Sequence, residues 1–301
     1  MNIKRILFPT DFSPCADIAL SHALFHAEIY GAELHIVHGV VHVAEEVPYF
    51  NVEPEIIEAK MEEVARTQLA EALQPHREKP FQILEENIRG QSAANIILDY
   101  AADRSCDMIV MGTHGRRFLS HFLLGSVAES VSRLAPCPVI TVRAGESAHS
   151  NLKPIRHILV TLDFSPMSKK ALQLAENIAK THGAEKITLI HVLENYFYPG
   201  GVEPGIAAIM ELLPRLTDQC RERLENYAAK MTKDNYGVFC EVPLGRPAHT
   251  IVKFAQNNDV DLIIAGAGGS GGLGHMLLGS TVERILRLSA CPVFTFKPDS
   301  K

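Results

Sequence analysis

The chain has 301 residues, a formal net charge of −6 and 21% charged residues, which is typical of a globular protein with room for two domains. The negative charge disfavours a general nucleic-acid binder, and no apolar run reaches the roughly 20 residues of a membrane span. The opening residues read as a strand, so we expect no secretion signal. Six cysteines are scattered without zinc-finger spacing, and we expect reduced thiols in a cytoplasmic protein.

The first half alternates predicted strands and helices. A short apolar strand is followed by Ser13, a predicted helix N-cap, with Pro14 at the first helical position and Gly31 after the helix end. Further helices are predicted near 54–74, at 93–102 and at 126–134. The predicted strands are Ile6–Phe8, Leu34–Val37, Phe81–Leu84, Met108–Met111 and Val139–Val142. Apolar strands alternating with helices indicate a parallel, doubly wound sheet.

The second half repeats the first. The segments 107–142 and 261–296 align without a gap, and we count about 17 identical positions among these 36. The segment Ile6–Pro14 likewise matches Ile158–Pro166. A repeat of this extent indicates duplication and fusion. We predict two tandem α/β domains, 1–145 and 155–301, joined by a linker at 146–154 that is small, polar and ends in proline.

A glycine pattern, G-x2-G-x9-G-S, occurs once in each half. Its members are Gly112, Gly115, Gly125 and Ser126, and then Gly266, Gly269, Gly279 and Ser280. Each copy follows a predicted strand and opens a predicted helix, whose free N–H groups and positive dipole suit a phosphate. Without a Cβ, glycine lets the backbone approach a ligand closely. Alternatively, the glycines only form turns and the serines only cap their helices.

An aspartate follows the first strand of each half, at Asp11 and Asp163. Because parallel strands end at one edge of a sheet, each aspartate should lie near the glycine loop. Its carboxylate could accept hydrogen bonds from a ribose or a base. The alternative is that it only supports the turn before Ser13 or Ser165.

Two histidines, His38 and His191, also occupy equivalent positions. They invite a metal or pH-sensing interpretation. We favour the simpler alternative, in which each packs or bonds to backbone at a strand end.

The motifs of both halves resemble the universal stress protein family in its tandem form. The resemblance spans essentially the whole chain and rests on four segments, Pro-Thr-Asp-Phe-Ser (9–13), Met-Gly-Thr-His-Gly-Arg (111–116), Leu-Leu-Gly-Ser-Val-Ala-Glu (123–129) and Ala-Pro-Cys-Pro-Val (135–139). It implies two Rossmann-like domains of the adenine nucleotide alpha-hydrolase type, each with a mainly parallel five-stranded sheet flanked by helices. It also implies a cytoplasmic stress-response protein. Members of the family that carry this glycine motif usually bind ATP, so the resemblance implies ATP as the ligand.

The resemblance further implies which residues bind the nucleotide, with or without Mg²⁺. Asp11, after Pro9 and Thr10, would hold the ribose or base. The backbone near Gly39 and Val40 would meet the adenine, and Gly112 would pack on the ribose side. His114, Gly115, Arg116, Gly125 and Ser126 would surround the phosphates. The equivalent residues of the second half are Asp163, Val192, Gly266, Gly269, Gly279 and Ser280.

The assembly and the activity leave alternatives open. In the family the last strands, here Val139–Val142 and Val293–Phe296, pair across a two-fold axis, so we expect an intramolecular pseudo-dimer and leave a homodimer open. We predict no catalytic residues, no metal ligands, and partners that are an adenine nucleotide and an unidentified protein, with no nucleic acid or membrane. Slow ATP hydrolysis, or a scaffold that uses the insertions at 42–54 and 194–214, are the alternatives to a nucleotide-binding switch.

Overall fold

The computed structural model describes residues 2–42, 54–115, 124–143, 154–194, 204–231, 235–268 and 278–297. The chain divides into two compact units, residues 2–152 and 153–301. The insertions near 42–54 and 194–214 lie partly outside the described residues, as do Arg116 and Gly269. The predicted linker, 146–154, lies almost wholly outside them, and its boundaries stay a prediction.

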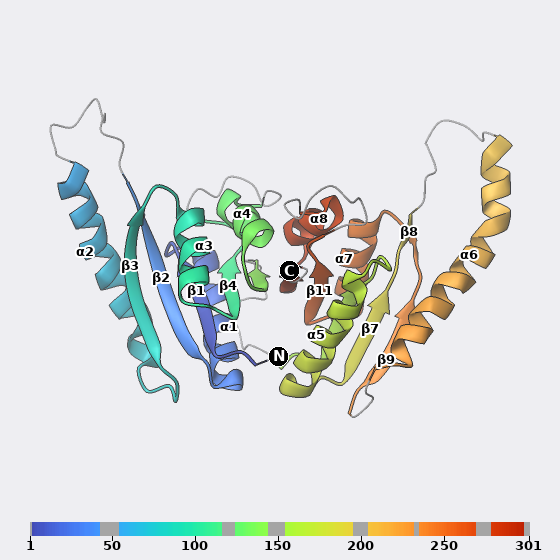
Figure 1. Ribbon diagram of the computed structural model, residues 1–301, viewed down its shortest axis with the longest axis horizontal. Helices are drawn as coiled ribbons and strands as arrows, with labels where there is room; N and C mark the ends of the chain where they lie inside the picture. The colour runs from blue at the N-terminus through green and yellow to red at the C-terminus, as the bar shows by residue number, and fades with distance from the viewer. Residues whose placement is uncertain are drawn as a thin grey trace. The chain divides into compact units, whose positions relative to one another are not determined.

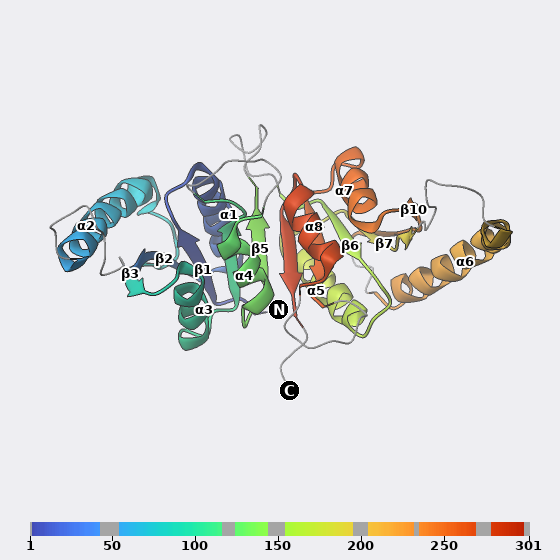
Figure 2. The same ribbon diagram turned by 90° about the horizontal axis from the view of Figure 1, so that it is seen from above.

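The first unit is a five-stranded parallel sheet with helices on both faces (Figures 1 and 2). The strand order is β3-β2-β1-β4-β5, and Figure 2 shows α1 and α2 on one face and α3 and α4 on the other. The elements are β1 (Arg5–Thr10), α1 (Pro14–Tyr30), β2 (Glu33–Val41), α2 (Pro54–Leu73), the 3-10 turn Gln74–His76, β3 (Ile83–Gly90), α3 (Ala93–Asp103), β4 (Met108–Gly112), α4 (Ser126–Leu134) and β5 (Val139–Val142). The predicted parallel, doubly wound fold is confirmed.

The second unit repeats this arrangement in the order β9-β7-β6-β11-β12, with a small additional pair, β8-β10. Its strands are β6 (His157–Thr161), β7 (Lys186–Ile190), β8 (Leu193–Glu194), β9 (Gly237–Glu241), β10 (Leu244–Gly245), β11 (Leu262–Gly266) and β12 (Val293–Phe296). Its helices are α5 (Met167–His182), α6 (Pro204–Ala228), α7 (Pro247–Asn257) and α8 (Ser280–Leu288).

Two strands of the first unit differ from their predicted bounds. The second strand continues from Val37 to Val41, and the third covers Ile83–Gly90 instead of Phe81–Leu84. Residues Leu34 to Val41 pair in parallel with Ile83 to Gly90 without a break. This ladder of backbone hydrogen bonds holds the polar Glu85–Asn87 in a strand at the sheet edge, where side-chain polarity gives no apolar signal.

The strand sequences are apolar because the strands are covered on both faces. Ile6, Leu7 and Ile109 are fully buried, as expected for the centre of a parallel sheet. One cluster of buried side chains continues from Leu7 and Ile109 through Val37 and Ile97 toward the strand C-terminal ends. The floor of that edge is therefore rigid and apolar.

The start of α1 follows its predicted capping pattern. The Ser13 hydroxyl accepts a hydrogen bond from the Ala16 N–H at 3.2 Å, and Pro14 takes the first helical turn. Gly31 ends α1 in the left-handed conformation at φ 60°, and Gly183 ends α5 at φ 68°.

Replacing Ser13 by alanine is expected to lower the free energy of unfolding by about 1 kcal/mol, because the Ala16 N–H loses its acceptor. Urea denaturation followed by circular dichroism measures the change. Ser165→Ala is the matched control, since α5 has no side-chain cap at its N-terminus and should keep its stability. An equal loss in both variants would contradict the assigned role of Ser13.

Candidate nucleotide site

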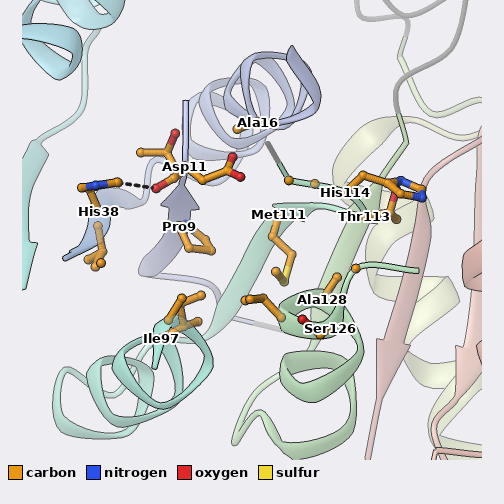
Figure 3. A pocket seen from close by; sticks show the side chains of 18 of the residues that line it. Pro9, Asp11, Ala16, His38, Ile97, Met111, Thr113, His114, Ser126 and Ala128 are labelled. Atoms are coloured by element: carbon orange, nitrogen blue, oxygen red, sulfur yellow. Dashed lines mark hydrogen bonds between the residues drawn. The ribbon is translucent and has the colours of Figure 1, made fainter. Parts of the chain in front are cut away.

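A cavity of about 570 Å³ opens at the C-terminal edge of the first sheet. Figure 3 shows Asp11 on one side of it, Ser126 and Ile97 on the other, and Met111 between them. We call it the strand-end cavity. The residues that line it are Pro9, Thr10, Asp11, Ala16, Val37, His38, Gly39, Ala93, Ile97, Met111, Gly112, Thr113, His114, Gly115, Leu124, Gly125, Ser126, Val127 and Ala128.

The two carboxylate oxygens of Asp11 have different surroundings: one accepts a hydrogen bond within a turn, and the other faces the glycine loop. Its Oδ1 accepts a hydrogen bond from the Ser13 N–H at 3.1 Å. A Cβ placed on Gly115 would lie 2.5 Å from Oδ2, so Oδ2 faces the loop. The turn-forming and ligand-binding interpretations of Asp11 are therefore compatible, because they use different oxygens.

The residue after Asp11 has an uncommon backbone conformation. Phe12 has φ 59°, in the left-handed region that L residues seldom adopt. Its N–H donates to Thr10 Oγ1 at 3.0 Å, and its ring lies 4.7 Å from that of His38, centroid to centroid. Phe164 repeats this conformation at φ 62°. Strained backbone of this kind concentrates at functional sites.

His38 bonds to backbone, as the simpler interpretation predicted. Its Nδ1 donates to the Thr10 carbonyl at 2.8 Å, a bond drawn as a dashed line in Figure 3. His191 makes the equivalent bond to the Leu162 carbonyl at 2.8 Å, and burial lowers the pKa of His191. Among the described residues, no group of three His, Cys, Asp or Glu side chains gathers in a way that could hold a metal ion.

Gly112 and Gly125 lie where a side chain would collide with neighbouring residues. A Cβ on Gly125 would lie 2.9 Å from the Thr113 carbonyl oxygen, to which the Gly125 N–H donates at 2.8 Å. A Cβ on Gly112 would lie 2.9 Å from Cys15 Sγ and 3.2 Å from the Cys15 backbone. Glycine at these positions lets the two ends of the loop and the start of α1 pack closely.

The start of α4 directs backbone donors at the cavity. Gly125 is the N-cap, and the first intrahelical bond runs from the Glu129 N–H to the Gly125 carbonyl at 2.9 Å. The N–H groups of Ser126, Val127 and Ala128 precede that bond and have no intrahelical acceptor. Ser126 is the first helical residue and not the cap, so its exposed hydroxyl is not used for capping.

Most of the predicted first-half residues lie together around the strand-end cavity. Nine of them line it, namely Pro9, Thr10, Asp11, Gly39, Gly112, His114, Gly115, Gly125 and Ser126. Val40, a fully buried residue of β2, does not line it, and a backbone role for it stays a prediction. Arg116 lies outside the described residues.

His38, Thr113 and the apolar wall of the cavity were not predicted as site residues from the sequence. This wall consists of Val37, Ala93, Ile97, Met111 and Leu124, among others. Their apolar character marks them equally as core residues, so only the strand-end position of Val37 and Met111 could have pointed to the cavity.

The second half repeats the aspartate turn and the helix start of this site. The Ser165 N–H donates to Asp163 Oδ1 at 2.9 Å. Gly279 is the N-cap of α8, with Ser280 as its first residue, and the Gly279 N–H donates to the Ala267 carbonyl at 3.4 Å. Gly266 ends β11, and Val192 follows β7. Gly269 lies outside the described residues.

Comparisons with known proteins agree with this architecture. The model of the universal stress protein family matches residues 2–143 and 154–297. A universal stress protein of Mycolicibacterium smegmatis is 27% identical over 300 residues, covering 97% of both chains. One from Methanocaldococcus jannaschii is 33% identical over 162 residues, which cover 53% of this chain and 89% of that protein.

Solved structures show the same fold. A universal stress protein from Archaeoglobus fulgidus superposes with a TM-score of 0.65 at 22% identity, covering 97% of this chain and 96% of that one. Another solved universal stress protein is in complex with cAMP, at 21% identity and a TM-score of 0.36 over 48% of this chain. In the described part of the chain, no helix has the length and apolarity needed to cross a bilayer. With both halves matched by the family model, the chain belongs to the universal stress protein family.

Proposed function

We propose that each half of the chain binds an adenine nucleotide, ATP in the first instance, at the C-terminal edge of its sheet, and that the protein acts as a nucleotide-dependent switch in a stress response. The observation that carries this proposal is the strand-end cavity. In it, the free N–H groups at the start of α4 face an apolar floor and the carboxylate of Asp11. The switch role rests on the family to which the chain belongs.

The phosphates fit the α4 end of the cavity. Backbone N–H groups and the positive end of the helix dipole stabilise an anion there. Gly112, Gly115 and Gly125 present backbone without side chains, and the Ser126 hydroxyl adds a donor. No lysine or arginine among the described residues lines this cavity. Within the described residues, the phosphate donors are therefore backbone N–H groups and the Ser126 hydroxyl.

The nucleoside fits the other end. Asp11 Oδ2 lies within reach of the loop and can accept a ribose hydroxyl. Val37, Ile97 and Met111 form an apolar surface suited to a flat base. A cavity of about 570 Å³ is within the roughly 300–1,000 Å³ of small-molecule sites.

Binding without fast turnover is the activity that these groups favour. The titratable side chains of the lining are Asp11, at the nucleoside end, and the histidines His38 and His114, and Nδ1 of His114 bonds to Thr113 Oγ1 at 2.8 Å. A general base needs to reach the attacking water, and the proposed orientation places Asp11 at the ribose and not at the phosphates.

The substitution Asp11→Asn tests the ribose contact. The amide oxygen can still accept from the Ser13 N–H, so the turn should survive, while the charged acceptor at Oδ2 is lost. We expect ATP affinity at the first site to fall by about 10- to 100-fold, the loss typical of a hydrogen bond to a charged group. Equilibrium dialysis with ATP measures it, and Asp103→Asn, on the last turn of α3, serves as control. Unchanged affinity in Asp11→Asn would contradict the proposed orientation.

A further inference from the structure

A second cavity, of about 440 Å³, lies between α2 and the end of β2. We call it the α2 cavity. It adjoins the strand-end cavity, since His38 lines both, and the ring of Phe12 forms part of its wall. The residues that line it are Phe12, His38, Ile56, Ile57, Lys60, Met61, Val64, Ala65 and Gln68.

The walls of the α2 cavity are almost entirely apolar. Ile56 and Val64 are 59% and 47% exposed, which leaves large aliphatic side chains around a hollow in contact with water. Contiguous apolar surface of this kind usually marks a binding site. Among the described residues of the lining, Lys60 is the one with a formal charge.

In the second half, two side chains of α6 lie against the equivalent phenylalanine. The guanidinium of Arg223 lies 3.9 Å from the centre of the Phe164 ring, and the ring of Tyr227 stacks on Phe164 at 6.3 Å. Phe164 therefore has an aromatic and a cationic neighbour from α6. Phe12 lines the α2 cavity.

Two positions explain the difference between the halves. Ile83 and Val238 hold equivalent register positions in the outer strands, paired with Leu34 and Ile187. Gln68 and Arg223 both lie fifteen positions before these residues. Ala72 and Tyr227 both lie eleven positions before them. The first half thus has glutamine and alanine where the second has the arginine and tyrosine that cover its phenylalanine.

We propose that the α2 cavity binds an aliphatic chain that carries an anionic head group, such as a free fatty acid. The chain would lie against Phe12, Ile57 and Met61, and the carboxylate would meet Lys60. Lys60 Nζ lies 2.6 Å from Glu63 Oε2, but both side chains are 66% exposed, and such a surface pair competes weakly with a ligand carboxylate. This site is separate from the proposed nucleotide function and does not depend on it.

Calorimetric titration of the full chain with laurate tests the proposal. We expect one saturable laurate site whose affinity falls about fourfold for each methylene removed in a series down to octanoate, the change that corresponds to about 0.8 kcal/mol per buried CH₂. Dodecanol should bind more weakly than laurate, and dodecyltrimethylammonium more weakly still, because Lys60 is the charged group of the lining. A cation that binds better than laurate would overturn the assignment of the head group.

The double substitution Gln68→Arg/Ala72→Tyr tests the location of the laurate site. It introduces the two side chains that lie against Phe164 in the second half. We expect laurate binding to be lost while ATP binding and the urea midpoint stay within error, since neither residue lines the strand-end cavity. Gln68→Ala, which leaves the cavity open, should retain laurate. If laurate fails to bind the unmodified chain, or binds the double variant equally well, the proposal is wrong.

Discussion

Replacing Gly115 by valine is expected to abolish ATP binding at the first site, with a loss of at least about 100-fold in affinity. A Cβ at this position lies 2.5 Å from Asp11 Oδ2, closer than any non-bonded contact allows. The carboxylate is the movable partner, so it would turn away from the cavity, and the valine methyl groups would occupy the phosphate end. Both proposed contacts of the ligand are then lost together, each a charge-assisted or backbone hydrogen bond.

The fold should survive this substitution, because the collision is with the end of a side chain and not with backbone. Isothermal calorimetry with MgATP measures the affinity, and circular dichroism checks the fold. Gly268→Ala is the control, since a Cβ there has nothing within 4 Å and Gly268 occupies the position of His114 in the second half. Full ATP affinity in Gly115→Val would show that the loop does not touch the ligand.

The largest loss of stability is expected from Ile109→Ala, which should lower the free energy of unfolding by about 2–5 kcal/mol. Ile109 lies in β4, an interior strand between β1 and β5, is fully buried, and belongs to the cluster that continues to the floor of the strand-end cavity. The substitution removes buried methyl groups and leaves a void that a parallel sheet cannot close without moving its strands.

Urea denaturation followed by far-UV circular dichroism measures this change. Tryptophan fluorescence cannot be used, because the chain contains no tryptophan. Ile56→Ala is the matched control. It removes the same atoms from a side chain that is 59% exposed, and its effect should stay within about 0.5 kcal/mol. Similar losses in the two variants would contradict the assignment of the core.

The parts of the fold that could be predicted from the sequence are those fixed by local chemistry. Pro14 after Ser13 set the start of α1, Gly31 set its end, and the apolar residues before Gly112 marked β4. As predicted from the repeated glycine pattern, its serine is the first residue of a helix in each half. Each of these signals depends on a few neighbouring residues and on backbone conformations that few residue types adopt.

Features set by partners distant in the sequence could not be predicted. The length of β3 depends on its ladder with β2, so the polar Glu85 and Glu86 gave no sign of it. His38 lines the strand-end cavity because its Nδ1 bonds to Thr10, a contact between two strands. The contrast between Gln68 and Arg223 is visible in the sequence, but its consequence is visible only once each helix is packed against its phenylalanine.

The central claim is that each half binds an adenine nucleotide at the C-terminal edge of its sheet. Calorimetric titration of the nucleotide-stripped protein with MgATP tests this claim most directly. We expect two binding events per chain. One should be removed by Gly115→Val and the other by Gly269→Val, its counterpart in the repeated pattern. Absence of heat in the titration, together with absence of bound nucleotide in the protein before stripping, would contradict the claim.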